Sequence, residues 1–392
     1  MGRTSTYLAI PLVVVAAGGA IQFLRPVPPV QVQAAPGPLK LPGAFSVAFP
    51  ATGQAALGAE SLGLVAETPN EQPVAIASLT KMMTAYLLLQ AQPLSTGEDG
   101  PVTTITNADV QVYQNDKAAG DSVVRVSAGE KLTERQLLEG LLLPSGDNIA
   151  TLIARQVAGT QANFVKKMND AASALKMTQT TYTDVSGVSP ATVSTAHDQV
   201  LMAQAAMQDR AFREIVRLPQ ADLPVAGRVF NVDFMVGKQG ITGIKTGSTL
   251  AAGSCFVGSF PITVGTSTEI LLGAVLGQPS LQVALTTDTQ ILHAVAPQFR
   301  TYAIAPPADG LARLTTAWGQ DSTLAPASPL QVLGYPGMPI DLAVKLTATK
   351  LPIEPGQGVA SLTLTTGTLS QTAPLQAAQA IRKPGPLWRL FR

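Results

Sequence analysis

Reactive and metal-binding side chains are scarce in this sequence. Its 392 residues include one cysteine, Cys255, and two histidines, His197 and His293. A single cysteine excludes a disulfide within the chain, and so few histidines and cysteines disfavour a zinc site of the usual ligand count. His197 follows a Ser-Thr helix start and His293 ends an apolar helical pattern, so a Ser-His-Asp triad is disfavoured as well. We expect neither a metal nor an organic cofactor.

Charged residues are also few. Asp, Glu, Lys and Arg make up 13% of the chain, with a net charge of +1, and this is about half the usual share for a soluble domain. No basic stripe is present, so a nucleic-acid partner is not indicated. The hydrophobic content of 46% is ample for a core, and the length predicts two folded units with a short tether.

The most informative stretch is a Ser-x-x-Lys element, Ser78-Leu79-Thr80-Lys81, which opens an apolar run. A spacing of three residues places Ser78 and Lys81 on one face of a helix, within reach of each other. A serine hydroxyl needs an adjacent base to become a nucleophile, and a lysine in apolar surroundings has a lowered pKa and can act as that base. Alone, the element is equally typical of a serine N-cap followed by a solvated lysine.

Two further elements follow in the order that a serine acyl-transfer site requires. Ser145-Gly146-Asp147-Asn148 lies between two helical patterns, and Lys245-Thr246-Gly247-Ser248 lies in a Gly-rich strand region. Ser-x-x-Lys, Ser-Asp-Asn and Lys-Thr-Gly together are the signature of penicillin-binding proteins and class A β-lactamases. The three elements in this order indicate acyl transfer at a serine.

An N-terminal signal or anchor with a Pro-rich spacer is predicted over residues 1–40. Its uncharged stretch, residues 8–24, lies between a signal-peptide core and a full membrane span of about 17 to 25 residues. Cleavage after Ala34 or Ala35 is the alternative, but the small-x-small pattern is imperfect there, so an uncleaved anchor is favoured. Residues 25–40 are expected to be an extended spacer. Either way the rest of the chain is expected outside the cytoplasm, in the periplasm or cell-wall space, and associated with the membrane.

Residues 41–299 are predicted to form one α+β unit, with an antiparallel sheet flanked by helices. The polar, Gly-rich stretch 98–128 is expected to be strand-like and to cover the edge of the site. The expected strands are 45–49, 62–66, 243–258 and 269–276, and the expected helices include one capped at Thr133 and others over 149–159, 162–175, 194–207 and 281–293.

The pattern of residue types changes after residue 299. Leucine and valine alternate with polar residues, and Pro and Gly separate the runs, which predicts a small all-β domain, a β-sandwich over residues 300–378. Residues 379–392 combine aromatic and positively charged side chains. This composition is typical of a basic amphipathic tail on an anionic membrane surface, with a disordered end as the alternative.

With these motifs in place, residues 42–299 resemble the serine D-alanyl-D-alanine carboxypeptidases, low-molecular-mass penicillin-binding proteins of the β-lactamase/transpeptidase-like superfamily. The likeness extends to Leu141-Leu142-Leu143-Pro144 before Ser145 and to Ala252-Gly253-Ser254-Cys255. A trailing β domain and a short amphipathic C-terminus also belong to the family's layout. The resemblance implies removal of the terminal D-alanine from peptidoglycan stem peptides, with β-lactam antibiotics as covalent inhibitors and no cofactor.

The resemblance also implies catalytic roles for three residues. Ser78 attacks the carbonyl of the penultimate D-alanine and forms an acyl-enzyme, while Lys81 takes its proton. Ser145 passes a proton to the departing D-alanine, and water then hydrolyses the acyl-enzyme.

Substrate binding is implied for the third motif. Lys245 and Thr246 hold the terminal carboxylate through charge-assisted hydrogen bonds, and Gly247 lets the substrate strand approach closely. Backbone N–H groups of Ser78 and Ser248 form the oxyanion hole.

The second motif departs from the family pattern. It usually reads Ser-Gly-Asn-Asp, whereas Asp147 and Asn148 stand here in reversed order. Both are therefore candidate modulators of the site. An Asp147 carboxylate facing the site stabilises charged Lys81 and weakens it as a base, or pairs with Lys245. Alternatively, Asp147 caps the next helix and Asn148 turns inward.

Two other functions stay open. A β-lactamase shares the three motifs but needs a deacylating base, and Glu214 is not followed by the asparagine that completes the usual Glu-x-x-Leu-Asn loop. A catalytically silent cell-wall-binding homologue is consistent with the altered second motif. Transpeptidation is open as a side activity.

Overall fold

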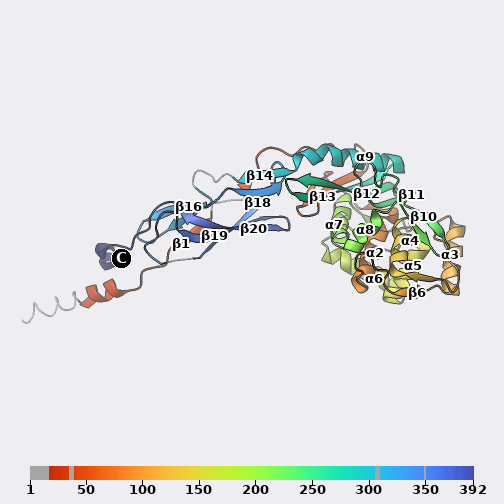
Figure 1. Cartoon of the computed structure of the whole chain (residues 1–392), viewed down its shortest axis with the longest axis horizontal. Helices are drawn as coiled ribbons and strands as arrows, with labels where there is room; N and C mark the ends of the chain where they lie inside the picture. The colour runs from red at the N-terminus through yellow and green to blue at the C-terminus, as the bar shows by residue number, and fades with distance from the viewer. Residues whose placement is uncertain (1–16, 35–38, 305–309, 348–349) are drawn as a thin grey trace, which may run out of the picture. The chain divides into compact units, whose positions relative to one another are not determined.

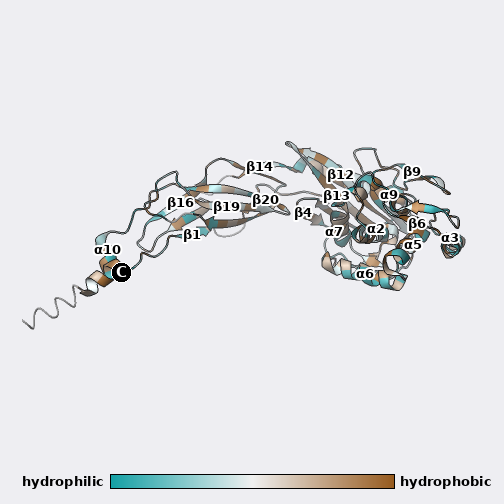
Figure 2. Cartoon of the chain, turned by 60° about the horizontal axis from the view of Figure 1, so that its bottom comes forward, coloured by the Kyte–Doolittle hydropathy of each residue, from teal (hydrophilic) through white to brown (hydrophobic). Residues whose placement is uncertain are grey.

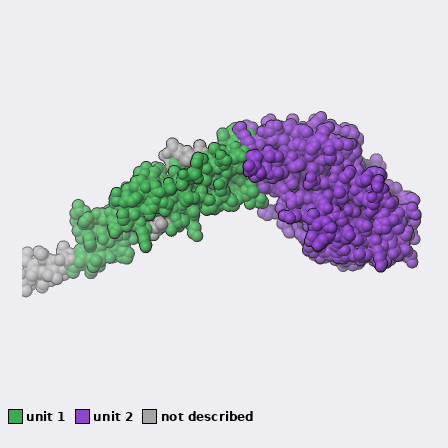
Figure 3. All heavy atoms as spheres, viewed as in Figure 1, with its two compact units in different colours: residues 1–43, 301–392 green, residues 44–300 purple. Residues whose placement is uncertain are grey.

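The structure is a computed structural model that describes residues 17–34, 39–304, 310–347 and 350–392. The chain divides into two compact units, which Figure 3 colours separately. The larger, here called the helix-and-sheet unit, is Ala44–Arg300, and the smaller, the sheet unit, combines residues 1–43 with 301–392. Among the described residues no helix has the length and apolarity to cross a membrane. Half of the uncharged stretch 8–24 lies outside the described residues.

The helix-and-sheet unit is centred on a five-stranded antiparallel sheet with strand order β11-β12-β13-β3-β4 (Figure 1). β11 is an edge strand, so one side of it is open to an extended ligand. β12 and β13 are joined by a turn after Val264, which pairs with Ser267. The strands are β3 (Gln54–Ala59), β4 (Gly63–Glu67), β11 (Ile244–Thr249), β12 (Gly253–Val264) and β13 (Ser267–Gln278).

Helices pack on the sheet from opposite sides (Figure 1). α7 (Ala196–Met207) packs against β3 and β13, and α9 (Leu281–Val295) against β12 and β13. Two glycines that pair across β12 and β13, Gly258 and Gly273, face α9, and a Cβ on either would collide with the Asp288 carboxylate. The paired glycines therefore make the room in which α9 lies close to the sheet.

A helical layer carries the first two motifs. η1 (Ala77–Thr80) runs directly into α2 (Lys81–Ala91), most of which is buried. α4 (Glu134–Leu142) begins at the expected capping box of Thr133, and α5 (Asp147–Ala158) ends at Gly159. The unit also contains α3 (Asn107–Ala119), α6 (Gln161–Ala174), α8 (Arg210–Val216), η2 (Ala296–Gln298) and the strand pairs β5 (Val74–Ala75) with β8 (Val193–Ser194), β6 (Val102–Thr104) with β7 (Lys131–Thr133), and β9 (Gln220–Leu223) with β10 (Gly227–Phe230).

Three sequence predictions in this unit were wrong. The stretch 98–128 is not mainly strand-like, because α3 occupies its middle, with a Thr106–Asp109 capping box and a left-handed Gly120 at its end. Residues 45–49 form no strand. The stretch 243–258 is two strands, β11 and β12, joined by a tight turn at 250–252. α3 was missed because its stretch is polar, whereas the alternation at 45–49 was a false strand signal and the short turn at 250–252 did not interrupt the strand pattern.

The sheet unit contains a seven-stranded sheet with order β1-β15-β16-β20-β19-β18-β2. The expected alternation is confirmed in β19, where Leu362 and Leu364 are buried. Its C-terminal strands are β15 (Ala312–Thr315), β16 (Asp321–Pro326), β18 (Pro339–Leu346), β19 (Gly358–Thr366) and β20 (Leu369–Ala377), and a separate pair joins β14 (Arg300–Ile304) to β17 (Leu330–Gly334).

The two outer strands of this sheet come from the N-terminal segment. β1 (Gln31–Ala34) pairs antiparallel with β15, from Gln31 opposite Thr315 to Ala34 opposite Ala312. β2 (Leu39–Lys40) pairs with β18. The sequence predicted an extended spacer here, whereas the structure uses these residues as edge strands. The chain ends in α10 (Pro386–Phe391), which begins with a proline in its first turn.

Candidate active site

Ser78 lies in the short η1 helix at the start of α2. The preceding residue, Ala77, has a φ of 48°, in the left-handed region that side chains rarely adopt. The Thr80 hydroxyl donates to the Ala77 carbonyl at 2.8 Å, and a Cβ on Gly187 would collide with that same carbonyl. The backbone before Ser78 is thus held in a strained turn from two sides, as is common at functional sites.

Lys81 is completely buried, and its Nζ atom has a well-defined set of neighbours. It lies 2.7 Å from Ser78 Oγ, 2.6 Å from Asp147 Oδ1 and 3.1 Å from the Ser186 carbonyl oxygen. A neutral amine has two N–H groups and one lone pair. When the N–H groups point to Asp147 and to Ser186, the lone pair faces the Ser78 hydroxyl. The expected contact between serine and lysine is therefore present, in a geometry that suits proton transfer.

Burial and charge act on Lys81 in opposite directions. Desolvation lowers its pKa, and the Asp147 carboxylate raises it by less, so the pKa lies below the ordinary lysine value. Asp147 therefore favours the protonated form of Lys81, but this effect is smaller than that of burial.

The second motif follows one of the two predicted arrangements, in which the Asp147 carboxylate faces the site. Gly146, not Asp147, is the N-cap of α5, so Asp147 is free to pair with Lys81. Asn148 does not face the site: its amide group bonds the backbone N–H and carbonyl of Val124, at 2.9 Å each. The pairing of Asp147 with Lys81 is thus the outcome, and the helix-cap alternative is wrong.

Ser145 lies in the turn between α4 and α5, with a φ of 68°. Its hydroxyl is buried and makes no hydrogen bond to any described residue. A buried hydroxyl without a partner is uncommon and costs free energy. It is therefore available to a group that enters the site.

The third motif lies on the edge strand β11, directly against Ser78. A Cβ on Gly247 would lie 2.9 Å from the Ser78 backbone nitrogen, so only glycine lets the strand approach this closely. Ser248 follows, with its side chain exposed. The sequence prediction that Gly247 permits a close approach concerned the substrate; in the structure, the close neighbour is the backbone of η1.

Lys245 is buried beneath the same strand, together with Thr246. Its Nζ atom donates to the Thr246 carbonyl at 3.0 Å. Burial, and to a smaller extent the nearby Lys81, lower the pKa of Lys245 to about 7, although Asp147 and Asp233 oppose the shift. The carboxyl of Asp233 is itself buried, which raises its pKa to about 6. A cation held this far from water gains much from an incoming anion.

Two features of the site were not predicted from the sequence. The Asp184 carboxylate accepts hydrogen bonds from the N–H groups of Gly187 and Val188, at 2.7 and 3.0 Å, and so folds the loop that offers the Ser186 carbonyl to Lys81. Asp233 is the second. An aspartate in a polar loop, such as Asp184 before Gly187, favours an Asx turn, but nothing in the sequence connects either aspartate to the three motifs.

The histidines take no part in this group. His197 pairs with Glu67, and His293 bonds the Gln239 carbonyl at 2.7 Å. Within the described ranges, no cluster of three or more His, Cys, Asp or Glu residues is arranged to hold a metal ion. The site thus combines a serine hydroxyl, a buried lysine amine in contact with it and a second buried lysine on the edge strand β11.

Solved structures share this architecture. The Streptomyces K15 DD-transpeptidase superposes with a TM-score of 0.54 at 26% sequence identity, over 63% of this chain and 98% of that one. The D-alanyl-D-alanine carboxypeptidase DacD of Francisella tularensis has the same fold, with a TM-score of 0.60 and 20% identity over 87% of this chain and 96% of its own. The predicted α+β fold class, with an antiparallel sheet flanked by helices, is confirmed.

Curated proteins are similar in sequence. The carboxypeptidase DacC of Escherichia coli is 30% identical over 209 residues, half of each chain. DacB2 of Mycobacterium tuberculosis is 37% identical over 39% of this chain and 55% of its own, and DacF of Bacillus subtilis is 24% identical over 81% of this chain and 82% of its own. The chain thus spans about half the length of the first two relatives.

The sequence profile of the D-alanyl-D-alanine carboxypeptidase family matches residues 54–275, more than half of the chain. The chain belongs to this family, as its three motifs predicted.

The burial of Lys245 predicts how stability depends on pH. The pKa of about 7 in the folded chain lies below the ordinary value of 10.5, so the cost of burying the charge is complete below pH 7 and disappears as the pH rises toward 10.5. Lys245→Met should therefore stabilise the protein below pH 7, by up to about 5 kcal/mol, and the gain should vanish near pH 10. Thermal unfolding of Lys245→Met and of the exposed control Lys238→Met across this range measures it. If the stabilisation by Lys245→Met did not depend on pH, the burial of a charged Lys245 would not be its cause.

Proposed function

We propose that this protein is a serine D-alanyl-D-alanine carboxypeptidase that removes the terminal D-alanine from peptidoglycan stem peptides. The observation that carries the proposal is the 2.7 Å contact between the buried Lys81 amine and the Ser78 hydroxyl, beside the strand that carries Lys245. The family of the chain supports the same activity.

The reaction begins with proton transfer from Ser78 Oγ to Lys81 Nζ as Oγ bonds to the carbonyl carbon of the penultimate D-alanine. The backbone N–H groups of Ser78 and Ser248 stabilise the oxyanion. When the tetrahedral intermediate collapses, the C–N bond breaks and the proton passes through the unpartnered Ser145 hydroxyl to the leaving amine. Water then hydrolyses the ester on Ser78, and Lys81 acts again as the base.

Lys245 gives the site its preference for a chain end. Its ammonium lacks a carboxylate within ion-pair distance among the described residues, so the terminal carboxylate of the substrate supplies the missing charge. The Thr246 hydroxyl adds a second donor. An internal peptide bond has no carboxylate at that place and leaves the buried cation unpaired.

The alternative functions receive less support. Glu214, the one glutamate that the sequence offered as a β-lactamase-type base, is bound to Arg135 at 2.6 Å and to the Gly97 N–H, and its pKa is lowered, chiefly by the Arg135 hydrogen bond. We therefore propose β-lactams as slowly released covalent inhibitors. A silent wall-binding protein would not need the contact between Ser78 and Lys81.

The same proposal assigns roles to the parts of the chain. The helix-and-sheet unit carries catalysis, and the sheet unit and the tail hold it outside the cytoplasm, near the membrane. We propose that the N-terminal segment is retained. Cleavage after Ala34 would remove β1, whose four residues pair with β15 at the edge of the sheet.

The activity is tested by two releases: of D-alanine from a peptide ending in D-Ala-D-Ala, and of D-alaninamide from the same peptide with a C-terminal amide. The acid should be hydrolysed at least about 30-fold faster, because the amide leaves Lys245 unpaired. Ser78→Ala should abolish release, whereas the exposed control Ser173→Ala on α6 should not change it. Equal turnover of acid and amide would contradict the role of Lys245, and turnover by Ser78→Ala would contradict the nucleophile.

The pairing of Asp147 with Lys81 predicts a shift in the pH profile. Asp147 raises the pKa of Lys81, and the base must be neutral to accept a proton, so the acid limb of kcat/KM should move to lower pH in Asp147→Asn. The matched control is Asp170→Asn, in which an exposed carboxylate on α6 is removed. Coinciding profiles for the wild type and Asp147→Asn would mean that Asp147 does not tune the base.

A further inference from the structure

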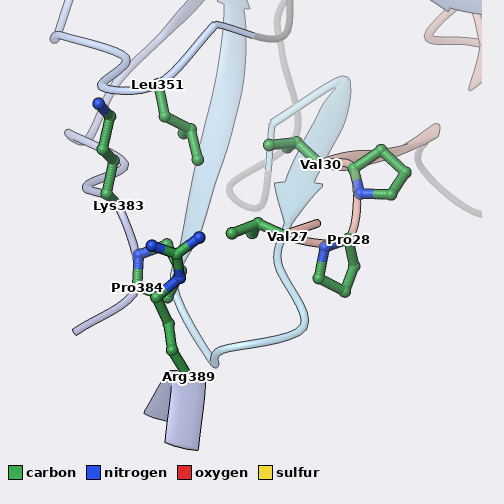
Figure 4. A pocket seen from close by; sticks show the side chains of 8 residues that line it. Val27, Pro28, Val30, Leu351, Lys383, Pro384 and Arg389 are labelled. Carbon is green, nitrogen blue, oxygen red and sulfur yellow. The ribbon is translucent and has the colours of Figure 1, made fainter. Parts of the chain in front are cut away.

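A cavity of about 470 Å³ lies in the sheet unit, between the N-terminal segment and the C-terminal tail. One wall consists of apolar residues that follow the N-terminal helix, and the other carries cationic side chains from the tail. Figure 4 shows the Arg389 guanidinium between these walls, facing the space that they enclose. The lining residues are Val27, Pro28, Pro29, Val30, Leu351, Lys383, Pro384 and Arg389.

The two ends of the chain are joined at this cavity. The Arg389 guanidinium lies 4.9 Å from the centre of the Phe23 ring, which belongs to the helix over residues 17–24. Arg392 donates to the carbonyls of Pro26 and Arg25, at 3.0 and 2.6 Å. The cavity therefore depends on the N-terminal segment and the tail together.

The charge at the cavity is positive and largely uncompensated. Glu354 pairs with Arg382, at 2.6 Å, and no acidic side chain of the described ranges pairs with Lys383 or Arg389. The Nε–H group of Arg389 is buried and has no hydrogen-bond acceptor. Because the Phe23 ring covers only a face of the guanidinium, the edge of the guanidinium remains able to bind an oxyanion.

Exposed apolar side chains surround the same place. Ile21 and Leu24 from the N-terminal helix are 66% and 77% exposed, and Leu387 and Phe391 from α10 are 72% and 83% exposed. Figure 2 shows α10 and the neighbouring helix partly in the brown of hydrophobic residues. The uncharged stretch 8–24 ends here. Apolar surface beside cationic groups is the arrangement of a segment at the boundary between lipid chains and headgroups.

We propose that this cavity binds the phosphate of an anionic phospholipid, with Lys383 and Arg389 as its ligands and the acyl chains beside Ile21, Leu24 and Phe391. The lining holds two cationic side chains and no acidic one, which favours an anionic headgroup over a zwitterionic one, because the latter would bring an ammonium group to them. The tail and the N-terminal segment thus form one lipid-binding element. This inference rests on the proposed retention of the N-terminal segment.

The two tryptophans of the chain provide a probe. Trp318 and Trp388 lie 5.8 Å apart, edge to face, and Trp388 belongs to α10. The full chain in a nonionic detergent is titrated with dioctanoyl phosphatidylglycerol, dioctanoyl phosphatidylcholine or inorganic phosphate, and tryptophan fluorescence is followed. Flotation of the full chain with phosphatidylcholine vesicles separately tests membrane association through the N-terminal segment.

The proposal expects saturable binding of phosphatidylglycerol at a concentration about tenfold or more below that of phosphatidylcholine. Lys383→Gln/Arg389→Gln should lose this preference, and the control Lys167→Gln/Lys345→Gln, with the same loss of charge elsewhere, should keep it. Equal binding of the two lipids, a preference that survives in the double variant, or tighter binding of free phosphate than of phosphatidylglycerol would each overturn the proposal. Failure to float would contradict the membrane anchor, and leaves the carboxypeptidase assignment unaffected.

Discussion

The site depends on one constraint, the burial of the Lys81 amine among three oxygen atoms. A lysine in water is protonated at neutral pH and cannot take a proton from serine. Here burial lowers its pKa, and a neutral amine that donates to the Asp147 carboxylate and the Ser186 carbonyl would direct its lone pair to Ser78. Asp147 belongs to α5, Ser186 to a loop and Ser78 to η1, so three segments far apart in the sequence hold one amine in place.

The second cation of the site is buried by the same packing. Lys245 lies under the edge strand β11, and Gly247 allows that strand to contact the backbone of Ser78. Two buried ammonium groups repel each other, and each lowers the tendency of its neighbour to stay charged. Asp147 and Asp233 offset part of that repulsion. Seen in this way, an aspartate in the second motif is a consequence of local charge balance, and need not disable the base.

The sequence predicted the reactive residues of the site better than the residues that hold them in place. The three motifs indicated Ser78, Lys81 and Lys245 because catalysis restricts residue type at fixed spacing. The aspartates that position or balance them, Asp184 and Asp233, lie in loops whose place in space depends on tertiary packing. The sequence could not decide between the two orientations of Asp147 either. Only the structure shows that Gly146 is the N-cap of α5, which leaves the Asp147 carboxylate free to pair with Lys81.

The same distinction applies to the fold. Strongly periodic helices such as α5 and α9 were predicted within a few residues, since their apolar faces repeat along the chain. α3 was missed because its stretch is polar, with few buried side chains. β1 was missed because a Pro-rich neighbourhood conceals a four-residue alternation. Whether a short edge strand forms depends mostly on the strand it pairs with, and that partner lies far away in the sequence.

The most direct test of the account is mass spectrometry of the intact protein after incubation with benzylpenicillin. The account predicts one penicilloyl group per chain, on the tryptic peptide that contains Ser78, and no adduct on Ser78→Ala. A folded wild-type protein that forms no adduct, or one that is modified at a different serine, would contradict the assignment of Ser78 and Lys81 as nucleophile and base.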